Sequence, residues 1–118
     1  MLRNNVKIGN WTYKINPAIK KYALRDAGFT QTTHGEFRYA HPLYLDSPYD
    51  TIGFVKIDVN ESLTQLDILT VGNDKMTKIN LFKNKKLQPV VDLLKFNLND
   101  LVEREIISEV KWFICYSL

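Results

Sequence analysis

The sequence has one cysteine, two histidines and five scattered glycines in 118 residues. A lone cysteine, Cys115, cannot form an internal disulfide, which suits a reducing compartment, so we expect a cytoplasmic protein. A structural zinc site needs about four nitrogen or sulfur ligands, and Cys115, His34 and His41 lie far apart in the chain, so no metal site is predicted. The glycines form no phosphate-binding motif, so we expect no ATP, GTP or NAD cofactor.

Long apolar runs and a strong charge excess are also missing. The longest apolar stretch, Trp112–Tyr116, is far shorter than the roughly 20 residues that span a bilayer, and Met1–Asn5 opens no signal-like run. The net charge is +3, from 16 basic and 13 acidic residues that are interspersed. The basic run Lys83–Lys86 is typical of a solvated turn. We therefore expect neither a membrane nor a nucleic acid as a partner.

What remains is an ordinary globular composition. The chain is 45% hydrophobic, 25% charged and 12% aromatic, which is sufficient for one hydrophobic core without disulfides. Since domains commonly run to about 100–150 residues, we expect one domain over residues 1–118.

The N-terminal third contains a hairpin pattern and then a helix pattern. Apolar residues alternate over Trp11–Ile15, which predicts a strand, and Gly9–Asn10 before it predicts a turn from a preceding strand. The Asn16–Pro17 pair then predicts the start of a helix over residues 17–27, because Asn caps well and Pro suits the first helical position. Gly28 predicts the left-handed end of that helix, with Phe29 packed back on it.

From residue 29 to residue 82 the apolar period is two, which is typical of strands. The expected strands are 29–33, 36–41, 55–59, 63–71 and 75–82, with a loop at Pro42–Asp50. Short connections require antiparallel pairing, because a parallel pair needs a long crossover.

A long helix is predicted from Gln88 to Glu105. Its apolar stripe consists of Leu87, Val90, Val91, Leu94, Leu98, Leu101 and Val102. Phe96 projects from the polar side, and is either a solitary exposed aromatic or a residue covered by a second layer or a partner subunit. The tail after Glu109 predicts a last strand, paired with the sheet or with another chain.

These elements together predict an α+β fold. Six or seven antiparallel strands, in one sheet or in two, pack against the long C-terminal helix, with the shorter helix near residues 17–27.

The loop Pro42–Asp50 is the segment most suggestive of ligand binding. Loops of this length on a rigid sheet often carry function. Its tyrosines offer stacking faces, and its aspartates suit a cationic group such as an amine or a sulfonium. The alternative is a packed crossover whose aspartates only form turns. The predicted ligand-binding residues are His41, Tyr44, Asp46 and Tyr49.

Three segments carry a family resemblance: Thr12–Phe29, Asp46–Tyr49 and Asn99–Arg104. They resemble a family of small lactobacillal proteins of unknown function labelled "putative amino acid metabolism". The resemblance implies two β-sheets packed against one principal helix, and a remote likeness to S-adenosylmethionine decarboxylases. Those enzymes cleave themselves before a serine, and Glu61–Ser62 is a superficial match in an expected turn. The resemblance supplies no catalytic residues, so none is assigned.

Three hypotheses about function follow. The first is a non-catalytic domain that binds a small metabolite or a protein partner, in support of amino-acid or sulfur amino-acid metabolism. The second is an enzyme acting on an amino-acid-like substrate, with His41, Asp46 or Asp50 as the acid or base. The third is a homodimeric module that associates through Phe96 or the tail 110–118.

Overall fold

The computed structural model describes residues 2–45, 49, 51–74, 76–83 and 85–110, and these form seven strands and two α-helices. In chain order the elements are β1 (Asn5–Ile8), β2 (Trp11–Ile15), α1 (Lys21–Ala27), β3 (Thr30–Gln31), β4 (Phe37–Tyr44), β5 (Thr51–Val59), β6 (Leu66–Gly72), the 3-10 turns η1 (Leu81–Lys83) and η2 (Lys85–Leu87), α2 (Gln88–Glu103) and β7 (Ile107–Val110).

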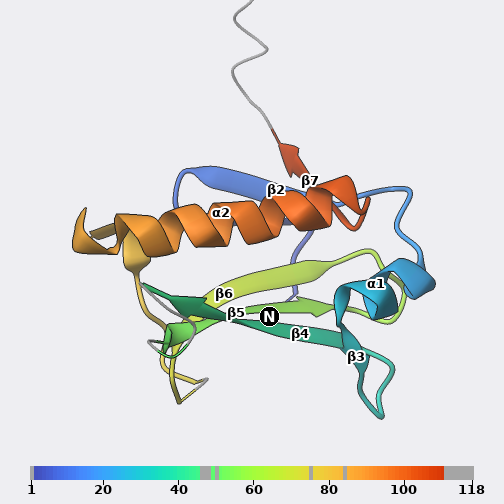
Figure 1. Cartoon of the computed structure of the whole chain (residues 1–118). Helices are drawn as coiled ribbons and strands as arrows, with labels where there is room; N and C mark the ends of the chain where they lie inside the picture. Colours follow the sequence, from blue (N-terminus) through green and yellow to red (C-terminus); the bar gives the residue numbers. More distant parts are fainter. Residues whose placement is uncertain (1, 46–48, 50, 75, 84, 111–118) are drawn as a thin grey trace, which may run out of the picture.

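The strands form two antiparallel sheets with α2 between them (Figure 1). One sheet has the order β1-β2-β7 and the other the order β3-β4-β5-β6. Every strand pair in both sheets is antiparallel. The predicted α+β class is confirmed, and the strands form two sheets rather than one.

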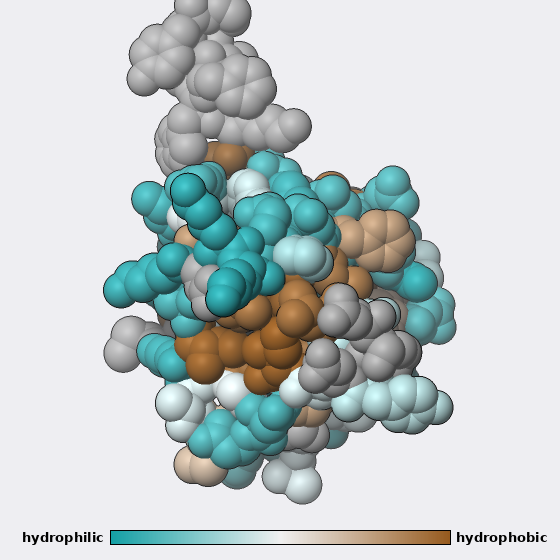
Figure 2. Space-filling view, turned by 60° about the vertical axis from the view of Figure 1, so that its left-hand side comes forward, coloured by the Kyte–Doolittle hydropathy of each residue, from teal (hydrophilic) through white to brown (hydrophobic). Residues whose placement is uncertain are grey.

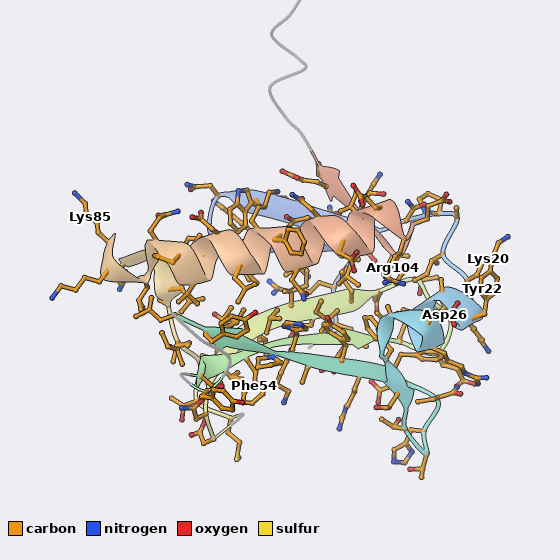
Figure 3. All side chains as sticks on the ribbon, in the orientation of Figure 1. Lys20, Tyr22, Asp26, Phe54, Lys85 and Arg104 are labelled. Carbon is orange, nitrogen blue, oxygen red and sulfur yellow. The ribbon has the colours of Figure 1, made fainter. Side chains whose placement is uncertain are left out.

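Helix α2 provides the centre of the core. It begins with Pro89 in its first turn, where the missing amide costs no hydrogen bond, and ends close to the predicted position. Leu94, Leu98 and Leu101 on its stripe are at most 1% exposed. On the far face of the four-stranded sheet, Phe54 points away from the helix (Figure 3). The burial of the leucine stripe confirms the predicted docking of this helix on antiparallel strands.

The predicted start of the first helix is wrong. The Asn16 Oδ1 atom accepts a hydrogen bond from the Ala18 amide (2.8 Å), and the Ile19 amide donates to the Asn16 carbonyl (3.0 Å). These bonds close a separate turn, so α1 begins only at Lys21. The predicted end is right: Gly28 has φ 106°, and the Phe29 amide donates to the Leu24 carbonyl (2.9 Å) as in a Schellman cap.

The segment Pro42–Tyr44 is strand rather than the expected loop, because β4 continues through it and pairs with β5. Strand β3 pairs with β4 only at Phe37 and Arg38, so β4 has a free edge beyond Arg38. A proline fits such an edge because it has no amide hydrogen to lose from a ladder.

The strand predicted over residues 75–82 is replaced by a single bridge, Val71–Lys78, and by η1. Side chains compete for the backbone on both sides of that bridge. The Asp74 carboxylate accepts from the Met76 and Thr77 amides (2.9 Å each), and the Asn80 Oδ1 atom accepts from the Phe82 amide (2.9 Å).

Phe96 is 72% exposed, so neither sheet covers it within this chain.

Figure 2 shows apolar side chains gathered between α2 and the four-stranded sheet at the end where α2 begins. Half-buried Leu45, Ile52 and Leu87 pack against the buried core cluster. Strand β7 pairs with β2 and shares only Val110 with the strand predicted after Glu109, since residues 111–118 lie outside the described residues. Among the described residues, no helix is long and apolar enough to cross a bilayer.

Candidate functional site

Two strand edges, β1 of the small sheet and β6 of the large one, face each other across a seam. At one end the Arg3 amide donates to the Leu66 carbonyl (2.8 Å), and the Leu66 amide donates back to Arg3 (2.9 Å). At the other end the Ile79 amide donates to the Thr70 carbonyl (2.9 Å). The backbone thus bonds β6 to the segment before β1 at one end and to the segment before η1 at the other, and a hollow lies between these two contacts.

That hollow is a cavity of about 460 Å³, which we call the seam cavity. Its lining comes from the β1–β2 turn, from β6 and from the segment that leads into η1. The lining residues are Lys7, Ile8, Gly9, Asn10, Ile68, Leu69, Thr70, Lys78, Ile79, Asn80 and Phe82. The volume lies within the range of about 300–1,000 Å³ that is usual for small-molecule sites.

The ring of Phe82 forms one wall and is fixed by its neighbours. It meets the ring of Trp11 edge-on, with centroids 5.5 Å apart at 76°. A Cβ atom placed on Gly9 would lie 2.5 Å from the Phe82 ring, so a side chain at that position would displace the ring. Gly9 also has φ 60°, which L-residues rarely adopt, and this turn therefore requires glycine for two separate reasons.

The edge of β6 contributes backbone groups to the cavity. Leu66 and Thr70 use their outward-facing groups to bond Arg3 and Ile79. Backbone groups alternate sides along a strand, so the amide and carbonyl of Ile68 point the same way, toward the seam. The cavity therefore offers a main-chain donor and a main-chain acceptor beside its side chains.

The charge of the lining is one-sided. Lys7 and Lys78 come from separate elements, and no aspartate or glutamate lines the cavity. The Thr70 hydroxyl donates to the Ile79 carbonyl (2.7 Å), and the Asn80 Oδ1 atom is already engaged, so the Asn80 amide nitrogen remains a donor. Cationic groups and amide donors beside an apolar wall favour an anionic ligand with a hydrocarbon part.

A second hollow, of about 430 Å³, lies between the end of α2 and β7. It is lined by Asn99, Val102, Glu103, Ser108 and Glu109. Val102 is its single apolar residue, and the Glu109 carboxylate already pairs with the Lys95 ammonium at 2.6 Å. Its lining carries two carboxylates and no cation, so its charge is opposite to that of the seam cavity, and one of the carboxylates is already paired.

Lys95 forms a polar cluster that joins α2 to the small sheet. Its Nζ atom donates to the Tyr13 hydroxyl (2.9 Å) and to the Glu109 carboxylate (2.6 Å), and lies 4.8 Å from the centre of the Trp11 ring. Burial lowers the pKa of Lys95, but the hydrogen bonds to Glu109 and Tyr13 outweigh burial, so the pKa lies above its ordinary 10.5. Burial also raises the pKa of Tyr13 above 10.0. These groups satisfy one another, so the cluster holds the helix in place.

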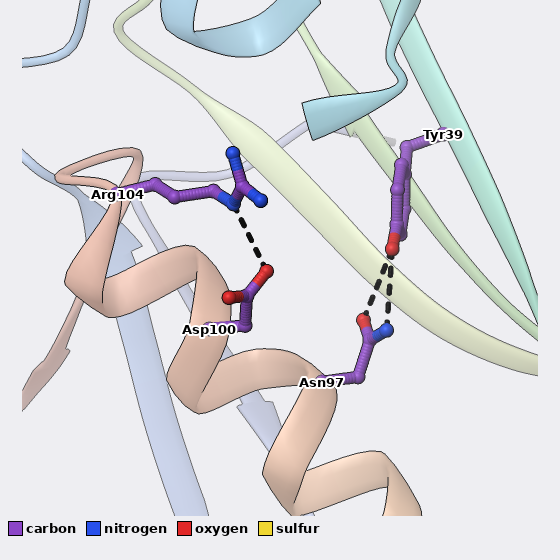
Figure 4. A network of polar contacts seen from close by, with 4 residues as sticks. All are labelled: Tyr39, Asn97, Asp100 and Arg104. Atoms are coloured by element: carbon purple, nitrogen blue, oxygen red, sulfur yellow. Dashed lines mark hydrogen bonds and ion pairs between the residues drawn. The ribbon is translucent and has the colours of Figure 1, made fainter. Parts of the chain in front are cut away.

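A neutral contact joins α2 to the large sheet (Figure 4). The Tyr39 hydroxyl and the Asn97 side-chain amide exchange hydrogen bonds of 3.2 and 3.3 Å. One helical turn further on, the Arg104 Nε atom pairs with the Asp100 carboxylate at 3.0 Å. Burial raises the pKa of Tyr39, although the hydrogen bond with Asn97 opposes that rise.

The predicted ligand-binding residues lie on β4 and beyond its end. His41 is half-buried, its Nδ1 atom is 2.9 Å from the Pro42 carbonyl oxygen, and its ring is nearly parallel to that of Tyr39, with centroids 6.3 Å apart. Tyr44, the last residue of β4, is also half-buried.

Tyr49 is 98% exposed, and Asp46 lies outside the described residues. The three described residues of the predicted set do not line the seam cavity; they are His41, Tyr44 and Tyr49. Ligand binding by these four residues stays a prediction.

The residues that line the seam cavity were missed from the sequence. Lys78 and Phe82 fell within a predicted strand, and Lys7 within an ordinary hairpin. The glycine of the β1–β2 turn is a local signal, but nothing local shows that Phe82 approaches it. In the part of the chain that the structure describes, no three His, Cys, Asp or Glu residues gather as metal ligands.

The similarities to known proteins extend over nearly the whole chain. The profile of the DUF1831 family, described as "Putative amino acid metabolism", matches residues 2–108. The crystal structure of a DUF1831 family protein from Lactobacillus plantarum, at 1.20 Å resolution, is similar with a TM-score of 0.83 and 30% identity, over 92% of this chain and 97% of that one. No curated protein matches. The matched residues include every residue that lines the seam cavity.

Proposed function

Because this chain belongs to the DUF1831 family, described as "Putative amino acid metabolism", we propose that it binds a small metabolite of amino-acid metabolism without transforming it. The observation that supports this proposal is the seam cavity, with Lys7 and Lys78 on one side and an apolar wall around Phe82 on the other. The lining offers charge, amide donors and hydrocarbon surface, which are the means of holding a small amphipathic anion. We also place the protein in the cytoplasm, because its single cysteine suits a reducing compartment.

The test is to identify a bound molecule and to locate it. Native mass spectrometry of protein purified gently from its own cells should show an added mass of metabolite size. In ¹H–¹⁵N spectra, the recovered molecule should shift the backbone amides of Gly9, Ile68, Thr70 and Phe82. It should also be recovered unchanged after incubation with the protein.

The outcomes separate the proposed site from the loop predicted from the sequence. Shifts confined to Tyr44, Tyr49 and their neighbours, abolished by replacing Tyr44, Asp46 and Tyr49 together, would move binding to that loop and overturn the seam cavity. Chemical conversion of the molecule would support the enzyme hypothesis instead. A concentration-dependent dimer with no bound molecule would favour the homodimeric module.

A further inference from the structure

We infer that the seam cavity takes a carboxylate without an ammonium group beside it: the 2-oxo or 2-hydroxy acid that corresponds to an apolar amino acid. This inference rests on the proposed function and narrows it to one class of ligand. It is drawn from the charges, donors and apolar surface of the cavity lining.

The charge of the lining favours the 2-oxo or 2-hydroxy acid, which is an anion, over the corresponding amino acid, which is a zwitterion. Lys7 on β1 and Lys78 before η1 are two lysines in the lining of one cavity, and the lining has no carboxylate to offset their charge. A ligand carboxylate gains from both lysines. An α-ammonium one carbon away is repelled by the same lysines and finds no acidic partner, so an amino acid loses much of what its carboxylate gains.

The hydrogen-bonding groups around the lysines suit oxygen atoms. The Ile68 amide points into the seam, and the Asn80 amide nitrogen remains a donor because its oxygen is bound to the Phe82 amide (2.9 Å). Asn10 adds a second side-chain amide. A 2-oxo or 2-hydroxy oxygen is an acceptor that these donors satisfy, whereas an α-ammonium group would find the Ile68 carbonyl as a neutral acceptor but no carboxylate to offset its charge.

The apolar wall accounts for the side chain of the ligand. Ile79 is half-buried, and Phe82 is 37% exposed with its ring held against Trp11 and Gly9. A branched or aromatic hydrocarbon group on this surface would bury apolar area that now contacts water. With about 460 Å³ available, the cavity has room for such an acid.

The probes are a matched pair, 4-methyl-2-oxopentanoate and L-leucine, which share a side chain and differ in the ammonium group. Titration followed by ¹H–¹⁵N spectra and by calorimetry should show the oxo acid binding at least about tenfold more tightly, with shifts at Gly9, Ile68 and Phe82. Raising the sodium chloride from about 50 mM to about 500 mM should weaken the binding, because the lysines are exposed.

Lysine variants test which charges hold the acid. Lys7→Met and Lys78→Met should each lower the affinity for the oxo acid by roughly tenfold or less, and the two together should lower it by more. They should also reduce the difference in affinity between the oxo acid and L-leucine. Lys14→Met is the matched control, since Lys14 is exposed on β2 and does not line the cavity. It should bind as the wild type does. Circular dichroism establishes that each variant is folded.

The possible failures are distinguishable. Equal or tighter binding of L-leucine at the same amides would overturn the ligand class and leave the proposed binding function in place. Undiminished affinity in the folded double variant Lys7→Met/Lys78→Met would overturn the role of the lysines. If neither probe moves a cavity amide, and no metabolite recovered from cells does so, both the ligand class and the proposed function fail.

Discussion

The two flanks of α2 are held to their sheets by different chemistry. On one flank Lys95 reaches the three-stranded sheet through an ion pair with Glu109 and the ring of Trp11. On the other flank Asn97 reaches the four-stranded sheet through a neutral pair with Tyr39. A helix turns about 100° per residue, so these two side chains lie about 160° apart, with the leucine stripe between them.

The difference follows from what each sheet presents to the helix. The inner face of the small sheet carries Tyr13 opposite Glu109, so its contact with α2 is partly polar. The facing strands of the large sheet carry buried apolar residues such as Val55 and Ile57, and the polar residue that they present to Asn97 is the neutral Tyr39. A charged contact responds to salt and pH, whereas a buried neutral pair responds chiefly to the loss of a partner. The shared apolar stripe should therefore dominate stability, and the flanks should differ in how they respond to conditions.

The largest expected effect comes from breaking the stripe on which both flanks depend. Leu98 is fully buried, so Leu98→Ala should lower the free energy of unfolding by about 2–5 kcal/mol, through lost burial and the cavity left behind. Urea denaturation measures this change. Phe96→Ala is the control, since Phe96 is 72% exposed on the same helix and should shift stability by no more than about 0.5 kcal/mol. If Leu98→Ala lowered the free energy of unfolding no more than Phe96→Ala does, the leucine stripe would not dominate the stability of the fold.

Features fixed by local pattern were predictable from the sequence. The stripe of α2, the Gly28 cap and the Gly9–Asn10 hairpin depend on residues within a few positions of one another, and all three are confirmed. Predictions from the local pattern were wrong where a side chain forms hydrogen bonds with nearby backbone groups. Asn16 closed its own turn, and Asn80 ended what alternation alone described as a strand.

The candidate site was beyond local pattern. The seam cavity joins residues 7–10, 68–70 and 78–82, and they meet because β6 is bonded to Arg3, just before β1, and to Ile79, just before η1. Neither tie has a signature in the sequence. The predicted binding residues fell instead on a conspicuous loop whose Asp46 lies outside the described residues, and their role remains a prediction.

Removing the charged flank should have a middle-sized effect that depends on salt. Lys95→Met leaves Glu109 and the Tyr13 hydroxyl without their cation, and should cost about 1–2 kcal/mol, since both charged side chains are only about one-quarter exposed. A double-mutant cycle with Glu109→Gln should give a coupling of about 1 kcal/mol that shrinks as salt is raised from about 0.05 M to about 1 M.

The matched change on the neutral flank is Asn97→Leu, which removes the partner of Tyr39. Its cost, about 1 kcal/mol, should stay constant over the same salt range because no charge is lost. If the Lys95–Glu109 coupling were as insensitive to salt as the Asn97 substitution, the contrast between the two flanks would fail.

Alkaline pH should produce the smallest effect, and it should act mainly on the Lys95 flank. In the folded chain the pKa of Lys95 lies above its ordinary 10.5, and the pKa of Tyr13 above 10.0, so both groups hold their protons more tightly than in the unfolded chain. The stability they contribute is present below about pH 10, and is lost as the pH rises through the raised values. Tyr39 titrates in the same direction on the other flank. Urea midpoints at about pH 8 and pH 11 should therefore show a loss that largely persists in Tyr39→Phe and is reduced by more than half in Lys95→Met/Tyr13→Phe. A midpoint that rises with pH, or a loss that disappears with Tyr39→Phe alone, would reverse the assignment of the charged flank.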